Sequence, residues 1–134
     1  MRTSNRTATL VLGANLVLSS LPAYAIDLNG AWADNESNCS RIFVKKNNKI
    51  SIARDSDHYG SGLIFQGNKI RGKIMTCTVT KRVEEAGSLN LIASCSNDVA
   101  LSTMQFSLKI DGDDKITRVY PGVPELSVSY VRCR

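Results

Sequence analysis

The residues that could most readily support catalysis surround the one histidine of the chain. His58 lies in "RDSDHYGSG", residues 54–62, together with Asp55, Asp57 and Ser61. A histidine base, a carboxylate that orients it and a hydroxyl nucleophile form the catalytic triad of many hydrolases. Neighbours in sequence seldom reach the distances that a triad needs, and Asp, Ser and Gly are residues that turns favour. We therefore interpret the segment as a turn, with a metal or ligand contact and catalysis as the alternatives.

A second acidic segment, "DGDD" at Asp111 to Asp114, raises the question of calcium binding. A calcium loop supplies about six or more oxygen ligands, and the D-x-D-x-D-G pattern with a distal Glu is absent from the sequence. Asp-Gly between two alternating runs instead predicts a hairpin turn. With one histidine, a multi-histidine zinc site is not expected either. We expect no metal, no cofactor and no enzymatic activity.

Four cysteines predict two disulfides. Cys39, Cys77, Cys95 and Cys133 are separated by 38, 18 and 38 residues. Zinc sites usually contain short C-x-x-C spacings, whereas an even number of widely spaced cysteines in a small exported domain indicates disulfide bonds. Spacing alone does not choose among the three possible pairings.

The first 25 residues are predicted to be a secretory signal peptide. Arg2 and Arg6 precede an apolar run from Ala8 to Leu18, and "SSLPAYA" ends with small residues at Ala23 and Ala25. This order of basic, apolar and A-x-A segments is typical of export signals. A run of 11 residues is too short to span a bilayer, which takes about 20 residues; a buried N-terminal helix is the alternative. We expect a periplasmic or secreted protein with no membrane span.

Cleavage after Ala25 would leave residues 26–134, which are 109 of the 134 residues, as one domain. Both charges lost are arginines, so the net charge would fall from +5 to +3. Runs of β-favouring residues follow, many alternating apolar and polar residues, as in "MQFSLKI" and "SLNLIASCS". A period of two marks strands with one buried face. "SNDVALSTM", residues 96–104, is the best candidate for a single helical turn.

Turn residues connect these runs: Asn47-Asn48, Gly67-Asn68, the loop "EEAG" and "DGDD". Eight or nine short strands joined mostly by tight turns predict an all-β antiparallel up-and-down meander. Such a meander avoids exposed edges most simply by closing into a small barrel.

"GAW", Gly30 to Trp32, matches the G-x-W motif that opens lipocalins and related calycin barrels. On this motif the chain resembles small secreted bacterial lipocalin-like barrels, a group that includes periplasmic protease inhibitors. The resemblance implies that Trp32 plugs the closed end of the barrel. It also implies that an inhibitor of this type would insert the residues before its first strand, here "IDLN", into its target. An ordinary core tryptophan in another β-sandwich is the alternative.

The register of the hairpin around "EEAG" predicts the disulfide pairing. Its two strands carry apolar residues at odd positions, and a slip of one residue would turn one apolar face to solvent. A five-residue loop, residues 84–88, would set Val83 against Leu89 and Cys77 against Cys95. Lys81 would then fall on the apolar face, which a bulge or an open barrel mouth would have to accommodate. Cys39 and Cys133 remain, near the first and last strands that barrel closure brings together.

A basic stripe is the main candidate for a binding surface on a strand. Lys69, Arg71 and Lys73 alternate along one predicted strand and could face an anionic polymer or an acidic partner. The solvated face of a half-buried strand is the alternative. Export and few aromatic residues argue against nucleic acid.

These observations favour a monomeric, exported, disulfide-containing β-barrel that acts by binding. Its partner would be a small ligand or an envelope component, for which a barrel supplies a cavity. The alternative is a periplasmic inhibitor of a protease or another hydrolase.

Overall fold

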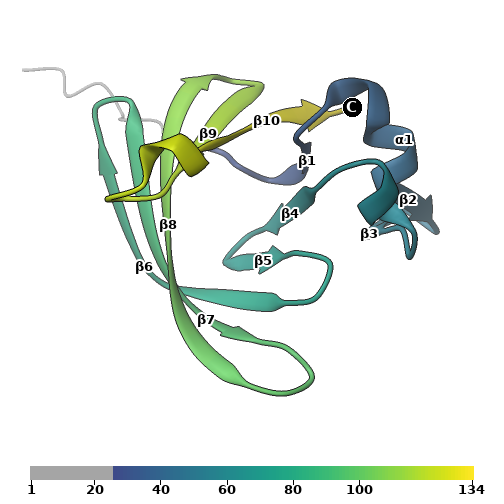
Figure 1. Cartoon of the computed structure of the whole chain (residues 1–134), viewed down its shortest axis with the longest axis horizontal. Helices are drawn as coiled ribbons and strands as arrows, with labels where there is room; N and C mark the ends of the chain where they lie inside the picture. The colour runs from purple at the N-terminus through teal and green to yellow at the C-terminus, as the bar shows by residue number, and fades with distance from the viewer. Residues whose placement is uncertain (1–25) are drawn as a thin grey trace, which may run out of the picture.

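The chain folds into a closed, all-antiparallel barrel of eight strands (Figure 1). The structure is a computed structural model that describes residues 26–134, so the predicted signal peptide at 1–25 lies outside it. Each strand pairs with the next, and β1 pairs with both β4 and β10, which closes the barrel. The barrel strands are β1 (Gly30–Ala33), β4 (Gly62–Gln66), β5 (Lys69–Arg71), β6 (Thr76–Glu85), β7 (Ser88–Ser96), β8 (Leu101–Gly112), β9 (Lys115–Val119) and β10 (Val128–Cys133). The predicted all-β meander is confirmed.

A helix and a hairpin lie outside the barrel, between β1 and β4 in the chain (Figure 1). These are α1 (Cys39–Ile42), β2 (Phe43–Lys46) and β3 (Lys49–Ile52). Asn47 and Asn48 join β2 to β3 with φ of 50° and 59°, the left-handed conformation that two-residue hairpins require. The predicted turn is therefore confirmed, but its hairpin forms a separate two-stranded sheet. Three short 3₁₀ turns complete the connections, at Glu36–Asn38, Ser56–His58 and Pro124–Leu126.

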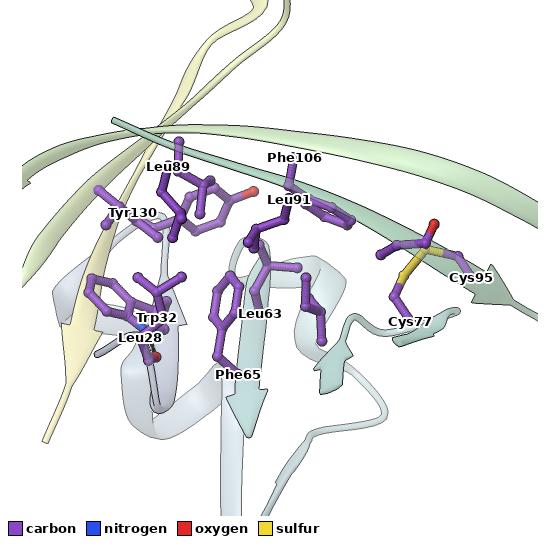
Figure 2. Close-up of a cluster of buried hydrophobic side chains, with 14 residues drawn as sticks. Leu28, Trp32, Leu63, Phe65, Cys77, Leu89, Leu91, Cys95, Phe106 and Tyr130 are labelled. Atoms are coloured by element: carbon purple, nitrogen blue, oxygen red, sulfur yellow. Dashed lines mark hydrogen bonds between the residues drawn. A yellow bond between two sulfur atoms is a disulfide. The ribbon is translucent and has the colours of Figure 1, made fainter. Parts of the chain in front are cut away.

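The barrel interior is packed with apolar side chains (Figure 2). Alternation along β7 explains this packing. Leu89, Leu91, Ala93 and Cys95 are buried, whereas Ile92, Ser94 and Ser96, which alternate with them, are exposed. Trp32 and Leu28 lie at one end of this cluster and the Cys77–Cys95 disulfide at the other. We call the end with Trp32 the closed end and the end with the disulfide the open end.

A second, smaller core lies on the outer face of β1 and β4. Ala31 and Ala33 point outward from β1, opposite to Trp32, and pack with Ile42 and Phe43. The small alanines leave room for these two large residues, so β1 is buried on both faces. Gly62 on β4 also lies directly beneath Phe43 and Ile42.

Two predicted elements differ from the structure. Lys69, Arg71 and Lys73 were expected to lie on one strand, but β5 ends at Arg71 and β6 begins at Thr76. Lys73 therefore lies in the turn between them. The predicted helical turn at residues 96–104 is also wrong, because β7 ends at Ser96, a tight turn follows and β8 begins at Leu101. Within that turn the Asn97 side chain accepts hydrogen bonds from the amides of Val99 and Ala100.

The register predicted for the β6–β7 hairpin is correct at one end and wrong at the other. Cys77 pairs with Cys95 and Val79 with Ala93, as expected. Beyond a bulge at Thr80, however, Glu84 rather than Val83 pairs with Leu89, and the connecting loop is only Ala86-Gly87. The bulge moves Lys81 off the inner face, because it now pairs with the outward-facing Ile92.

Both disulfides are those predicted. Cys77–Cys95 joins neighbouring strands inside the barrel, and Cys39–Cys133 ties α1 to the end of β10. Disulfides of this kind persist in oxidising, extracytoplasmic compartments. Within residues 26–134, no helix combines the length and apolar character that crossing a bilayer requires.

Candidate functional site

Trp32 seals the closed end, as the G-x-W resemblance implies. Its side chain is 1% exposed, and its indole Nε1 donates a 2.7 Å hydrogen bond to the Leu28 carbonyl. Residues Ile26 to Asn29, which we call the N-terminal strap, cross this end of the barrel. Leu28 is itself buried in the core (Figure 2). Gly30 begins β1 with a φ of 128°, a conformation that favours glycine. Trp32 and Gly30 therefore have a structural role, and the strap is part of the fold.

Arg132 holds the strap against the tryptophan. Its guanidinium carbon lies 4.3 Å from the centre of the Trp32 ring system. Its N–H groups donate to the carbonyls of Asp27, Asn29 and Asp113, and Asp114 pairs with its charge. The N–H groups of this arginine are thus used in contacts within the protein rather than for binding a ligand.

The basic stripe is not continuous. Lys69 Nζ donates to Thr78 Oγ1 at 2.6 Å, and Arg71 Nη2 donates to the Ile50 carbonyl at 3.1 Å, which connects the barrel to β3. Lys73 lies beyond the end of β5 and forms an ion pair with Asp57. These three side chains make contacts within the protein, and the structure gives no common face to all three.

The two acidic segments form turns, as predicted. His58 is exposed in the Ser56–His58 turn, and Asp113-Asp114 joins β8 to β9. Across residues 26–134, no three His, Cys, Asp or Glu side chains gather in a way that could hold a metal ion.

A pocket of about 480 Å³ opens beside the strap, and we call it the strap pocket. It lies between the strap, the β4–β5 turn and the middle of β6. Its apolar side is made by Ile26, Leu28, Phe65, Val79 and Leu91, most of them members of the barrel core. Its polar rim is made by Asp27, Asn29, Asn68, Thr80, Lys81 and Arg82.

The bulge at Thr80 builds the wall of this pocket. β5 has three residues and pairs with β6 up to Thr78, and in the β4–β5 turn the Asn68 carbonyl accepts a 2.8 Å hydrogen bond from the Val79 amide. Strand pairing between β5 and β6 does not extend beyond this point, although β6 continues to Glu85. Thr80 Oγ1 donates to the Ile92 carbonyl, which fixes the bulge. Because the register shifts there, Arg82 pairs with the inward-facing Leu91 and reaches the strap, where its Nη2 donates to the Ile26 carbonyl at 2.5 Å.

This arrangement can hold a molecule with an apolar body and a polar end. The buried side chains remove apolar surface from water, and the rim supplies amide, hydroxyl and cationic donors. Nothing in the sequence marked Arg82, Asn68 or Val79 as residues that line a pocket. The one signal in the sequence was Lys81, whose position on the apolar face called for either a bulge or an open barrel mouth; the structure has the bulge.

The open end has a different character. Three large apolar side chains are exposed there: Ile74 in the β5–β6 turn at 77%, Val99 in the β7–β8 turn at 92%, and Leu101 beside it at 82%. We call these residues the open-end tip. The buried Cys77–Cys95 disulfide crosslinks the two strands that lead into these turns.

The fold is a closed, antiparallel, eight-stranded barrel with one end plugged by Trp32, an architecture that is consistent with a lipocalin-like barrel. No protein-family model matches the chain, and no curated protein or solved structure is significantly similar to it.

Proposed function

We propose that this protein is an exported β-barrel binding protein that holds a small apolar or amphipathic molecule in the strap pocket. The observation that carries the proposal is the pocket itself, about 480 Å³ with a core-lined apolar side and a polar rim. Pockets for small ligands typically measure about 300–1,000 Å³ and combine these two features. An apolar body would cover Val79 and Leu91, while its polar end would meet Asn68 or Lys81.

Binding without catalysis fits the polar groups that are present. His58, the one imidazole of the chain, lies in a turn that is not part of the pocket lining. The two disulfides support an extracytoplasmic location, which we propose to be the periplasm or the medium. A small ligand that is free there, or a component of the envelope, is the proposed partner.

The proposal is tested with N-phenyl-1-naphthylamine, a neutral apolar dye whose fluorescence rises in apolar surroundings. Asn68→Trp places a large side chain at the rim of the pocket, at an exposed turn position. Because it fills the pocket, it should weaken dye binding about ten-fold or more, a loss of ~1.4 kcal/mol or more.

Gln105→Trp is the matched control, since Gln105 is exposed on β8 opposite Ile92 and lines no part of the pocket. It should leave dye affinity unchanged. Equal affinity in wild type and in both variants, or no binding in wild type, would refute the strap pocket as the binding site.

Inhibition of a hydrolase remains the second candidate function. It is supported by the open-end tip and not by the N-terminal strap, which was the segment expected to contact a target. The strap was expected to insert into a target, but Leu28 is 5% exposed and its carbonyl binds Trp32. The open-end tip is the feature that favours contact with a protein. If the protein inhibits a hydrolase, Ile74→Ser combined with Val99→Ser should abolish inhibition, whereas Asn68→Trp should preserve it.

A further inference from the structure

A second pocket lies on the outside of the barrel, where the β2–β3 hairpin stands beside β4 (Figure 1). It measures about 600 Å³, and we call it the hairpin pocket. Its apolar floor includes Ile50 and Ile64, which pack in the outer core. It adjoins the strap pocket, and the two share Asn29, Phe65 and Gly67 in their walls.

The charged side chains that line the hairpin pocket are both cations, Lys49 and Arg71. The amide side chains of Asn48 and Gln66 also line it, and no Asp or Glu of residues 26–134 does. The chain around each cation is free of acids as well, because residues 41–54 and 62–83 contain lysines and arginines but no Asp or Glu. A cleft lined by charges of one sign attracts ions of the other sign, so this pocket favours anions.

Arg71 is held at the pocket with donors to spare. Its side chain is half-buried, and its Nη2 donates to the Ile50 carbonyl at 3.1 Å, which places the guanidinium next to Lys49 in the chain. A guanidinium has several further N–H donors. Within residues 26–134, those of Arg71 donate to no other protein group, and Arg71 forms no ion pair. They remain for a ligand in the pocket.

The hairpin concentrates positive charge at its tip. Lys46 and Lys49 pair directly across the two strands, and Lys45 precedes Lys46. Like charges that face each other across strands destabilise a hairpin. In the part of the chain that the structure describes, none of these lysines forms an ion pair. An anion bound beside Lys49 would reduce this repulsion.

We propose that the hairpin pocket is a second binding site, which takes the phosphate group of a phosphate monoester. A phosphate dianion carries several strong acceptor oxygens, which suit the fork of Arg71, the ammonium of Lys49 and the neighbouring amides. The group that carries the phosphate would lie over the apolar floor. This site does not depend on the function proposed for the strap pocket, which has other cations, Lys81 and Arg82.

The test compares glucose 6-phosphate, glucose 6-sulfate and glucose, which differ in charge on the same sugar. At about pH 7.5 the phosphate is largely a dianion, whereas the sulfate is a monoanion. In ¹⁵N NMR titrations of residues 26–134, the phosphate should shift the amides of Asn48, Lys49 and Arg71. It should bind about three-fold to ten-fold more tightly than the sulfate, and glucose should bind more weakly than both. Equal affinity for phosphate and sulfate, or phosphate shifts centred on Asn68 and Lys81, would overturn the proposal.

Lys49→Met removes one charge from an exposed position of the hairpin, and it should weaken glucose 6-phosphate binding about three-fold or more. Lys115→Met is the matched control, because Lys115 is exposed on β9 and does not line the hairpin pocket. It should leave the affinity unchanged. Arg71→Lys keeps the charge but lacks the planar fork, so it should also weaken binding. Equal losses in Lys49→Met and Lys115→Met would mean that only net charge attracts the ligand, which would contradict the site.

A phosphate monoester can come from a soluble metabolite or from a lipid headgroup, and vesicles distinguish the two sources. The protein is sedimented with phosphatidylcholine vesicles that contain or lack phosphatidic acid. Binding that requires phosphatidic acid and is lost in Lys49→Met identifies a headgroup, whereas binding of glucose 6-phosphate alone identifies a soluble ester. If neither compound binds in a way that depends on Lys49, the proposal is wrong. Asn68→Trp should leave phosphate binding intact, so this site and the strap pocket can fail independently.

Discussion

At the residue scale, the largest buried side chain is also one of the most constrained. Trp32 fills the closed end, and the guanidinium of Arg132 stacks on its ring. Its indole N–H donates a hydrogen bond to the Leu28 carbonyl. A buried indole N–H needs such an acceptor, so the tryptophan and the strap stabilise each other. The strap in turn forms one wall of the strap pocket.

Trp32→Ala should cost about 3–5 kcal/mol of unfolding free energy, the range for deletion of a large core aromatic side chain. Trp32→Phe should cost less, because it keeps an aromatic ring beneath Arg132 and loses only the outer part of the indole and its hydrogen bond. Chemical denaturation measures both variants. Native wild-type fluorescence should show the short-wavelength emission of a buried indole, and emission typical of indole in water would contradict the plug.

A carboxylate on β8 gives a pH prediction. A hydrogen bond from Thr117 Oγ1 at 2.6 Å, assisted by Lys109, lowers the pKa of Asp111 below its ordinary value. A lowered folded-state pKa stabilises the protein above the unfolded-state pKa, and this stability is lost as pH falls through the folded-state value. Thr117→Val should raise the pKa of Asp111, as followed by NMR of the carboxyl carbon. The effect on stability should be small, because Asp111 is close to solvent. An unchanged pKa in the variant would show that the hydrogen bond is not the cause.

Residue types alone identified the structural positions but not the residues that line the strap pocket. The cysteines and Trp32 stand out by type and location, and their roles followed from general chemistry. The sequence could not show that Arg82 lines the pocket or that Arg118 is buried, because a charged residue on a strand normally faces water. Arg82 is exposed, and it lies opposite the inward-facing Leu91 because the bulge at Thr80 shifts the register. The inward direction of Arg118 depends on its pairing with Leu108, which the sequence pattern does not specify.

At the scale of elements, β1 is the strand that depends most on close packing. Its inner face carries Trp32, and its outer face is covered by α1 and β2. The neighbouring Gly62 on β4 leaves space for this cover. An added Cβ there would come within 2.5 Å of Phe43 Cζ and 2.7 Å of Ile42 Cγ2.

Gly62→Ala should therefore destabilise the protein by about 1–3 kcal/mol, the usual cost of overpacking a core. Gly72→Ala is the matched control, because its added Cβ would meet Met75 at an ordinary 3.5 Å. That variant should stay within about 0.5 kcal/mol of wild type. Thermal unfolding of the two variants side by side makes the comparison, and equal stabilities would argue against the close contact of α1 and β2 with the barrel.

The alternation of apolar and polar residues predicted most of the strands. The segments that it predicted wrongly are those whose conformation depends on tertiary packing. β7 and β8 were clear because one face is buried along their length. The run "RIFVKK", residues 41–46, contains β-favouring residues, yet Arg41 and Ile42 are helical. Here Cys39 is bonded to Cys133 and Ile42 packs with Ala31 and Ala33 of β1. A local pattern contains no information about that long-range contact.

At the scale of the whole molecule, two crosslinks of different accessibility hold the barrel. Cys77 and Cys95 are buried in the interior, whereas Cys39 and Cys133 are partly exposed. Both disulfides were predictable from the sequence. Strand register predicted Cys77–Cys95, and the meeting of the first and last strands in a closed barrel predicted Cys39–Cys133.

Mild reduction of the folded protein should open Cys39–Cys133 before Cys77–Cys95, because thiol–disulfide exchange requires access of the attacking thiolate. Alkylation of the released thiols followed by peptide mass spectrometry identifies the order. Earlier labelling of Cys77 and Cys95 would mean that the open end of the barrel is less tightly packed than the structure shows.

The central claim is that the strap pocket holds an apolar molecule, and the most direct measurement is to locate the bound dye by NMR. Backbone amide signals of the ¹⁵N-labelled protein, residues 26–134, are followed while N-phenyl-1-naphthylamine is added. The account predicts that the largest shifts cluster at Leu28, Asn68 and Lys81, and that Asn68→Trp removes them. Shifts centred on Ile74, Val99 and Leu101, with the strap pocket unaffected, would contradict it.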